Sequence, residues 1–192
     1  MFRVSSPDDD CNPLIGINNA KNITITGGGV VNGQIGLWWP CPQSRFISEY
    51  SNCSNHYRPR ILKIQNTSGI IIYNIKFKNS PMQAIALASV TDVHIHNVFI
   101  LQHSPVEDNY DKDGIDLNGQ NIVIENSHIR VGDDAVLITD RGGLSTNITV
   151  RNLKIRLSRG ISISSYTHYG VTNVTFENIH LHGDPINGVD KK

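Results

Sequence analysis

The sequence predicts an all-β fold, a parallel β-helix, and two observations carry this prediction. First, five segments share an apolar-x-apolar-x-Asn pattern, at residues 69–77, 92–100, 121–129, 147–155 and 173–181. Their asparagines, Asn74, Asn97, Asn126, Asn152 and Asn178, are 23, 29, 26 and 26 residues apart, which is a solenoid period. Second, apolar residues alternate within each segment, so the elements are strands and not helices.

A second set of short apolar strands follows the first, at residues 84–87, 114–117, 135–138 and 160–163. Each coil therefore turns the chain from one sheet to the next, and neighbouring coils bury their apolar residues against one another. The residues expected inside are Ile122, Ile124, Val136, Ile138, Ile148, Val150, Ile161 and Ile163. The repeated asparagines are expected to stack at the bends, where their amides satisfy turn backbone groups. We predict one domain, residues 1–192, with a polar loop insertion at residues 34–60.

The composition is that of a soluble, single-domain protein: 192 residues, 39% hydrophobic and 18% charged, with a formal net charge of zero. We expect a monomer. A neutral chain gives no electrostatic reason to expect a nucleic acid or a membrane as partner. No apolar run approaches the ~20 residues of a membrane helix. The N-terminal residues also lack the apolar stretch of a secretory signal.

Two other features point toward the secretory pathway. There are five Asn-x-Ser/Thr triplets, at Asn22, Asn52, Asn66, Asn147 and Asn173, and three cysteines within the first 53 residues. Asn22, Asn147 and Asn173 each open a strand, where such a triplet arises without any sugar, so Asn52 and Asn66 are the better glycan candidates. Cys41 and Cys53 bracket the insertion and are candidates for a disulfide that leaves Cys11 odd; three free thiols in a reduced chain are the alternative.

Several motifs together resemble a known family. They are Ala20-Lys21-Asn22-Ile23-Thr24-Ile25-Thr26-Gly27, Trp38-Trp39, Asn79-Ser80-Pro81 followed by Gln83, Asp113-Gly114-Ile115-Asp116, Gly132-Asp133-Asp134-Ala135 and Gly160-Ile161-Ser162-Ile163. Their order, from about residue 13 to residue 188, is similar to that of the polygalacturonases, glycoside hydrolase family 28. The resemblance implies a right-handed parallel β-helix of the pectin-lyase type and inverting hydrolysis of galacturonan, without a cofactor. It also implies a pectic polysaccharide substrate and a secreted or cell-wall location.

The same resemblance implies the site residues. The family's catalytic aspartates correspond to Asp113, Asp133 and Asp134, with Asp133 as the general acid and the other two holding the attacking water. The candidates for lining the substrate groove are Gln83, Asp116, Arg159, Ser162 and Lys192.

The residues support this chemistry on their own terms. Setting Ile115 over Val136 and Ile161 places Asp113, Asp134 and Arg159 at one level of successive coils, about 4.8 Å apart. Carboxylates that close do not all ionise freely, so one keeps a proton and acts as acid while another remains a base. Hydrolysis of a glycosidic bond requires such a pair. One coil step is nearer the ~5 Å of retaining enzymes than the ~6.5 to 9.5 Å of inverting ones, so inversion rests on the resemblance.

Other interpretations of these residues are a turn, a metal site and a binding module. An aspartate at a coil bend is more often a turn former. Asn109, Asp111, Asp113 and Gly114 imitate the start of a calcium loop, but its twelfth position is Gln120 instead of glutamate. His94 and His96 lack a third ligand at metal spacing and are read as strand residues, so no metal is predicted. A calcium-dependent pectic lyase and a non-catalytic carbohydrate-binding or structural β-helix stay open.

Three departures from the family pattern predict an impaired enzyme. Asp111-Lys112-Asp113 replaces Asn-Thr-Asp, and Ser158-Arg159-Gly160 replaces Gly-His-Gly. The permanently charged guanidinium of Arg159 either holds a neighbouring aspartate ionised or binds a substrate carboxylate. At the C-terminus, Asp190 stands where the family's substrate-binding arginine is expected, and the chain is expected to be a truncated form.

Overall fold

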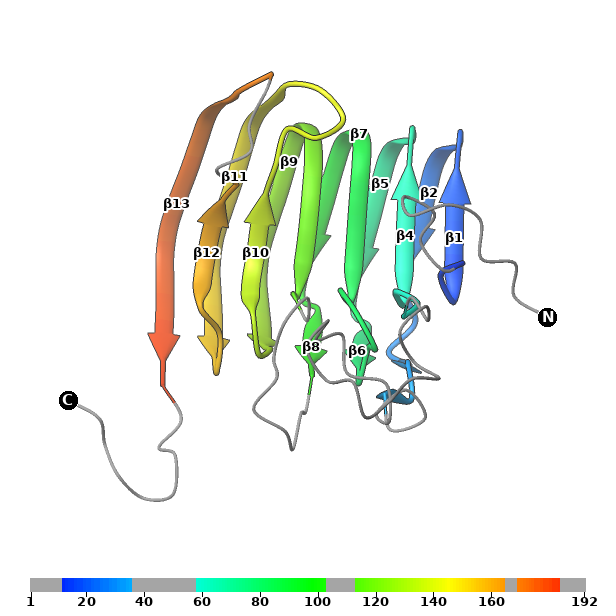
Figure 1. The fold of residues 1–192 in the computed structure, drawn as a ribbon, viewed down its shortest axis with the longest axis vertical. Helices are drawn as coiled ribbons and strands as arrows, with labels where there is room; N and C mark the ends of the chain where they lie inside the picture. The colour runs from blue at the N-terminus through cyan, green and yellow to red at the C-terminus, as the bar shows by residue number, and fades with distance from the viewer. Residues whose placement is uncertain (1–11, 36–57, 103–112, 165–168, 184–192) are drawn as a thin grey trace, which may run out of the picture.

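The computed structural model describes residues 12–35, 58–102, 113–164 and 169–183, and it shows a β-helix (Figure 1). These residues contain thirteen β-strands and no α-helix. The strands are β1 (Ile15–Asn18), β2 (Lys21–Ile25), β3 (Val30–Asn32), β4 (Leu62–Gln65), β5 (Ser68–Tyr73), β6 (Lys76–Lys78), β7 (Ile85–His96), β8 (Phe99–Leu101), β9 (Ile115–Arg130), β10 (Asp134–Ile138), β11 (Ser145–Arg156), β12 (Gly160–Ile163) and β13 (Val171–His182). The described residues contain no helix that is long and apolar enough to cross a membrane.

The strands pair in parallel from coil to coil and form three faces of the β-helix. Sheet 1 consists of β1, β4, the first part of β7, the first part of β9, and the whole of β10 and β12. Sheet 2 consists of β2, β5, the second part of β7, the middle of β9, β11 and β13. Sheet 3 consists of β3, β6, β8 and the ends of β9, β11 and β13. The predicted parallel β-helix is confirmed.

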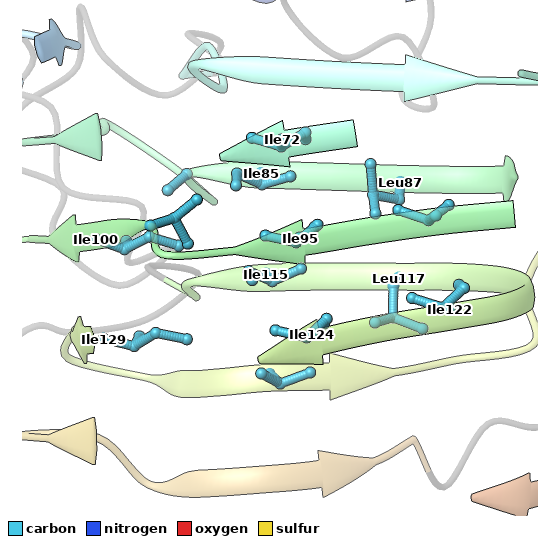
Figure 2. Close-up of a cluster of buried hydrophobic side chains, with 14 of the residues drawn as sticks. Ile72, Ile85, Leu87, Ile95, Ile100, Ile115, Leu117, Ile122, Ile124 and Ile129 are labelled. Atoms are coloured by element: carbon cyan, nitrogen blue, oxygen red, sulfur yellow. The ribbon is translucent and has the colours of Figure 1, made fainter. Parts of the chain in front are cut away.

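The core lies between these sheets and is built from rows of isoleucine, leucine and valine (Figure 2). One row in sheet 1 runs through Leu62, Ile85, Ile115 and Val136, and all four side chains are fully buried. Branched side chains suit this arrangement because they pack well on a pleated surface, and burying each one contributes about 1.5 to 3 kcal/mol.

Six of the eight residues expected inside are buried to 1% exposure or less: Ile122, Ile124, Val136, Ile138, Ile148 and Val150. Ile161 is half-buried and packs against the core, whereas the prediction is wrong for Ile163, which is 49% exposed. Both lie in β12, which pairs with β10 on one side. In the described part of the chain no strand pairs with the other side of β12, so these side chains lack an adjacent coil to cover them.

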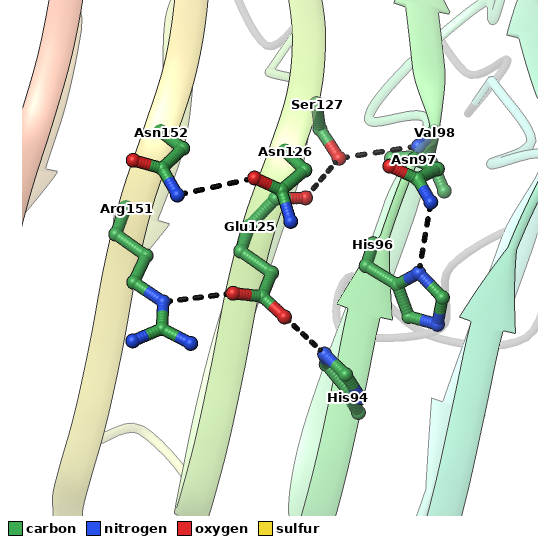
Figure 3. A network of polar contacts seen from close by, with 9 residues as sticks. All are labelled: His94, His96, Asn97, Val98, Glu125, Asn126, Ser127, Arg151 and Asn152. Carbon is green, nitrogen blue, oxygen red and sulfur yellow. Dashed lines mark hydrogen bonds and ion pairs between the residues drawn. The ribbon is translucent and has the colours of Figure 1, made fainter.

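The asparagines at the bend between sheets 2 and 3 have positive φ angles near 50°, a left-handed conformation that asparagine tolerates better than most residues. Asn152 Nδ2 donates to Asn126 Oδ1 at 3.1 Å, and Asn178 Nδ2 donates to Asn152 Oδ1 at 2.8 Å (Figure 3). The predicted stacking is therefore confirmed for these three. Asn97 departs from it, because its amide is hydrogen-bonded to the ring of His96 at 3.2 Å. The amides also bond to one another, where the prediction had them satisfying backbone groups.

A second ladder, which was not predicted as such, lies at the bend between sheets 1 and 2. Asn173 bonds to Asn147 at 3.3 Å, Asn147 to Asn121 at 2.8 Å, and Asn121 to Asp92 at 2.8 Å. These amides are structural, in agreement with the interpretation of Asn147 and Asn173 as strand openers.

The structure also weakens Asn66 as a glycan candidate. Its amide nitrogen donates to Asn18 Oδ1 at 3.2 Å, and the adjacent Thr67 is only 3% exposed. Asn52, the three cysteines and residues 36–57 of the predicted insertion lie outside the described residues.

Candidate active site

The outer face of sheet 1 brings the predicted site residues together where β9, β10 and β12 begin. Ile115 pairs with Val136, and Val136 pairs with Ile161, as the sequence predicts. One part of the predicted register is wrong: Asp134 pairs with Gly160, because a β-bulge between Asp134 and Val136 shifts the two strands by one residue.

Because of this shift, Arg159 lies beside Asp133 and not level with Asp134. The Arg159 backbone N–H donates to the carbonyl oxygen of Asp133 at 3.0 Å. Its guanidinium Nη1 atom lies 3.1 Å from Asp133 Oδ1. The arginine side chain is 56% exposed and the aspartate side chain 10% exposed, so the ion pair closes one side of the site at its solvent boundary.

Asp113, Asp133 and Asp134 each offer a carboxylate oxygen within 4.8 Å of the others. Asp113 is 5% exposed, Asp133 is 7% exposed and Asp134 is half-buried. The Asp134 backbone N–H donates to Asp113 Oδ1 at 3.0 Å, and Ser162 Oγ donates to Asp134 Oδ1 at 2.8 Å. The three carboxyl groups therefore form one cluster, held by hydrogen bonds between coils.

Two glutamines hold Asp113 from the preceding coil. Gln83 Nε2 lies 3.4 Å from Asp113 Oδ2, while Ser80 Oγ donates to the Gln83 carbonyl at 2.9 Å. Gln102, which sequence reasoning missed, donates from Nε2 to the carbonyl oxygens of Asp113 at 2.9 Å and of Met82 at 3.3 Å. Gln102 follows β8 directly, and its only sequence signal is a polar residue after an apolar strand.

The pKa of Asp113 is raised to about 6 because the carboxyl is buried and lies near Asp133. The pKa of Asp116 is also raised well above its usual value, by burial and by its interaction with Asp113. The charges of Arg60 and Arg141 act in the opposite direction on Asp116. Near neutral pH Asp113 and Asp116 therefore keep part of their carboxyl protons, as proton transfer between an acid and a base requires.

Three groups of residues in the sequence could serve as metal ligands: the three aspartates, the two histidines and the residues that imitate a calcium loop. In the described part of the chain, the trio is the one set of acidic, histidine or cysteine residues with ligand atoms close enough together to hold a metal. His94 and His96 lie in β7 as strand residues, and His94 Nε2 is bonded to Glu125 at 2.8 Å (Figure 3). Asn109 and Asp111 of the calcium interpretation, and Lys192 of the predicted groove, lie outside the described residues.

The fold and the site together define the class of protein: a parallel β-helix with three carboxyl groups clustered on one face. The model of the family Glycosyl hydrolases family 28 matches residues 2–192, so the chain belongs to that family.

Relatives and solved structures agree with this assignment. A polygalacturonase of Cryptomeria japonica is 32% identical over 143 residues, which are 74% of this chain and 26% of that protein. A probable exopolygalacturonase A of Aspergillus niger is 32% identical over 168 residues, 85% of this chain and 36% of that protein. The polygalacturonase structure from Erwinia carotovora has a TM-score of 0.76 at 25% identity and covers 94% of this chain and 51% of its own. The chain thus spans about a quarter to a half of the length of these relatives.

Proposed function

We propose that this chain carries the catalytic face of a glycosidase that hydrolyses α-1,4-galacturonan in pectin by inversion. The observation that carries the proposal is the trio of Asp113, Asp133 and Asp134, whose carboxylate oxygens lie within 4.8 Å of one another in a family of glycosyl hydrolases. Two or more carboxyl groups on one face supply the acid and the base that cleavage of a glycosidic bond needs.

In this proposal Asp133 protonates the leaving oxygen, and Asp113 and Asp134 orient and deprotonate the attacking water. Gln83 and Ser162, which bond to Asp113 and Asp134, hold those two carboxylates in place. We base inversion on the family and not on the geometry, because the distance between the carboxylates lies closer to the values of retaining enzymes.

Arg159 is the residue that makes us propose an impaired rate. Its guanidinium pairs at 3.1 Å with the carboxyl group of Asp133, which is the group that has to deliver a proton to the leaving oxygen. The guanidinium has to change partner, from Asp133 to the uronate carboxylate of the substrate, before Asp133 is able to act. The proposed substrate is pectic polysaccharide, and because pectin lies in cell walls we propose a secreted location.

The test is release of reducing ends from polygalacturonate by the purified chain and by its Asp133→Asn variant. We expect measurable turnover in the parent chain and a loss of at least about 100-fold in the variant, which removes the proton donor without changing shape. Asp92→Asn is the matched control, because Asp92 lies in the ladder between sheets 1 and 2 and its Oδ1 bond to Asn121 survives the change. Proton NMR of the first product anomer reports inversion.

Equal turnover in Asp133→Asn and the parent chain would contradict the assignment of the acid. Binding of polygalacturonate without turnover in any form would instead support the non-catalytic carbohydrate-binding alternative.

A further inference from the structure

The side chain of Gln102 reaches the site from sheet 3, and the proposed reaction gives it no role. Gln102 directly follows β8, and its backbone N–H donates to the carbonyl oxygen of Arg130 on the next coil at 2.8 Å. The residue is only 4% exposed. A packed side chain on a fixed backbone has few rotamers available, so its amide is held in one place.

This amide bridges two backbone carbonyl groups of the site. Gln102 Nε2 donates to the carbonyl oxygen of Asp113 at 2.9 Å and to that of Met82 at 3.3 Å. Met82 immediately precedes Gln83, whose own amide lies 3.4 Å from the carboxyl group of Asp113. Gln102 thus ties the backbone of Asp113 to the backbone beside its second contact.

Asp113 depends on such bonds because it lies at a bend and not within a strand. β9 begins two residues later, where Ile115 pairs with Ile85 of β7. The Asp113 carbonyl also accepts from the backbone N–H of Ala84, at 3.1 Å. Of these two bonds to the carbonyl, the one from Gln102 is the shorter.

The bonds to the Asp113 carboxyl group do not fix its position by themselves. Asp134 N–H donates to Oδ1 at 3.0 Å, but the contact of Gln83 with Oδ2, at 3.4 Å, is longer than the usual range of about 2.7 to 3.2 Å. The place of this carboxyl group therefore depends on how firmly the Asp113 backbone is held.

The other end of the Gln102 amide shows that stability does not account for the residue. Its Oε1 atom is buried and has no hydrogen-bond partner in the described part of the chain. A buried acceptor without a partner costs free energy, and an apolar side chain of the same length would avoid that cost. The donor atom, which holds Asp113, is what distinguishes glutamine from such a side chain here.

We propose that Gln102 is a positioning residue of the site: it fixes the Asp113 backbone, and through it the carboxyl group that orients the attacking water. The role rests on the proposed function for the reaction that it serves. Because the water has to be aligned in the transition state, the loss of this contact is expected in kcat and much less in KM.

The first test is Gln102→Met in the full chain, which keeps the length of the side chain and removes the donor. We expect kcat on polygalacturonate to fall by about tenfold or more, with KM changed by less than about twofold. The pKa of Asp113, followed by carbon-13 NMR of its carboxyl group, should fall from about 6 towards 3.8, because a loosened carboxyl group gains contact with water.

Thr67→Val is the matched control for the loss of a buried hydrogen bond. Thr67 is 3% exposed and lies between β4 and β5, at the opposite end of the sheet 1 strands from the trio. Its Oγ1 atom donates to the Gln65 carbonyl at 2.7 Å, and valine removes that bond without changing the shape of the side chain. Urea unfolding compares the stability loss of the two variants. We expect kcat and the pKa of Asp113 to stay unchanged in Thr67→Val.

Gln102→Glu is the second variant and keeps the shape of glutamine. An ionised glutamate only accepts hydrogen bonds and repels the two carbonyl oxygens, whereas a protonated one donates to one of them. Burial raises the pKa of a carboxyl group, so the protonated form gains population as the pH falls from about 7 to about 5. The ratio of kcat in Gln102→Glu to kcat in the parent chain should therefore rise over that range.

Three results would overturn the role of Gln102. They are an unchanged pKa of Asp113 in Gln102→Met, a kcat ratio for Gln102→Glu that does not depend on pH, and an equal loss of kcat in Thr67→Val at equal stability. If Gln102→Met does not fold, the pH dependence of Gln102→Glu decides. If the parent chain releases no reducing ends, the hydrolytic function fails, and the NMR titration still decides whether Gln102 positions Asp113.

Discussion

The Asp134 backbone N–H donates to Asp113 Oδ1 at 3.0 Å, so the carboxylate of one coil is fixed by the backbone of the next. This bond crosses the coil boundary at the β-bulge between Asp134 and Val136. The bulge adds one residue to β10 relative to β12, and it thereby sets Asp133 against Arg159 while Asp134 faces Ser162. The two adjacent aspartates consequently have different partners, which suits them for different roles.

We expect Asp113 to reduce stability near neutral pH. Its pKa is raised from 3.8 to about 6 in the folded chain, so the unfolded chain loses the proton first as the pH rises. Its contribution to stability is therefore fully present below about pH 4, declines as the pH rises and is lost above about pH 6. At about 1.4 kcal/mol per unit, the decline is at most about 3 kcal/mol.

The Asp113→Asn variant should lack this decline and be more stable than the parent chain at pH 7. The new amide is able to accept from Asp134 N–H, and its nitrogen is able to donate to Gln83 Oε1, a buried atom that has no partner in the described structure. Urea unfolding at pH 4 and at pH 7 measures the difference. A variant less stable than the parent at pH 7 would show that the hydrogen bonds of Asp113 outweigh its burial cost.

The asparagine ladder gives a second prediction, at Asn152. This residue accepts from Asn178, donates to Asn126 and has a φ of 54°. Asn152→Gly loses the hydrogen bonds but keeps the left-handed conformation, whereas Asn152→Ala loses both. We expect alanine to be less stable than glycine by about 1 kcal/mol, measured by urea unfolding. Equal stability of the two variants would mean that the backbone conformation costs nothing at this bend.

A third prediction concerns Glu125 on the outer face of sheet 2. His94 and Arg151 bind its two carboxylate oxygens at 2.8 and 2.7 Å and lower its pKa (Figure 3). A carboxyl group whose pKa is lowered by folding stabilises the fold at pH values above its ordinary pKa, which is 4.5 for Glu125. This stabilisation is lost as the pH falls through the lowered pKa. Glu125→Gln should therefore be slightly less stable at pH 7 and indistinguishable in strong acid. The effect should shrink in 1 M salt, because both partner side chains are 43% exposed. A difference that persists in strong acid would point to packing.

Much of this fold was predictable because a parallel β-helix repeats its pattern along the chain. Alternation in residues 121–129 and 147–155 predicts β9 and β11, and the aspartate motifs predict the cluster of Asp113, Asp133 and Asp134. The bulge was not predictable, since Ala135 is small and apolar and satisfies the alternation in either register; it is fully buried in the structure. The exposure of Ile163 depends on whether a further coil covers β12, and the apolar pattern of residues 160–163 carries no information about that. Arg141 acts at Asp116 through the folding of a loop, which no periodicity describes.

The last prediction is that Arg159→His raises hydrolysis of polygalacturonate. Histidine is shorter than arginine and is neutral over part of the working pH range, so the ion pair at 3.1 Å no longer occupies the Asp133 carboxyl group in the free chain. We expect kcat to increase by about tenfold or more, since one general acid typically contributes a factor of 10² to 10⁴. KM should rise at the same time if Arg159 also binds the uronate carboxylate, because histidine loses the bidentate contact.

Arg156→His, at an exposed position of β11, is the matched control for the loss of a surface arginine. Initial rates over a range of substrate concentrations separate kcat from KM. A fall in kcat in Arg159→His, with Arg156→His unchanged, would mean that the guanidinium positions Asp133 for the reaction and does not restrain it.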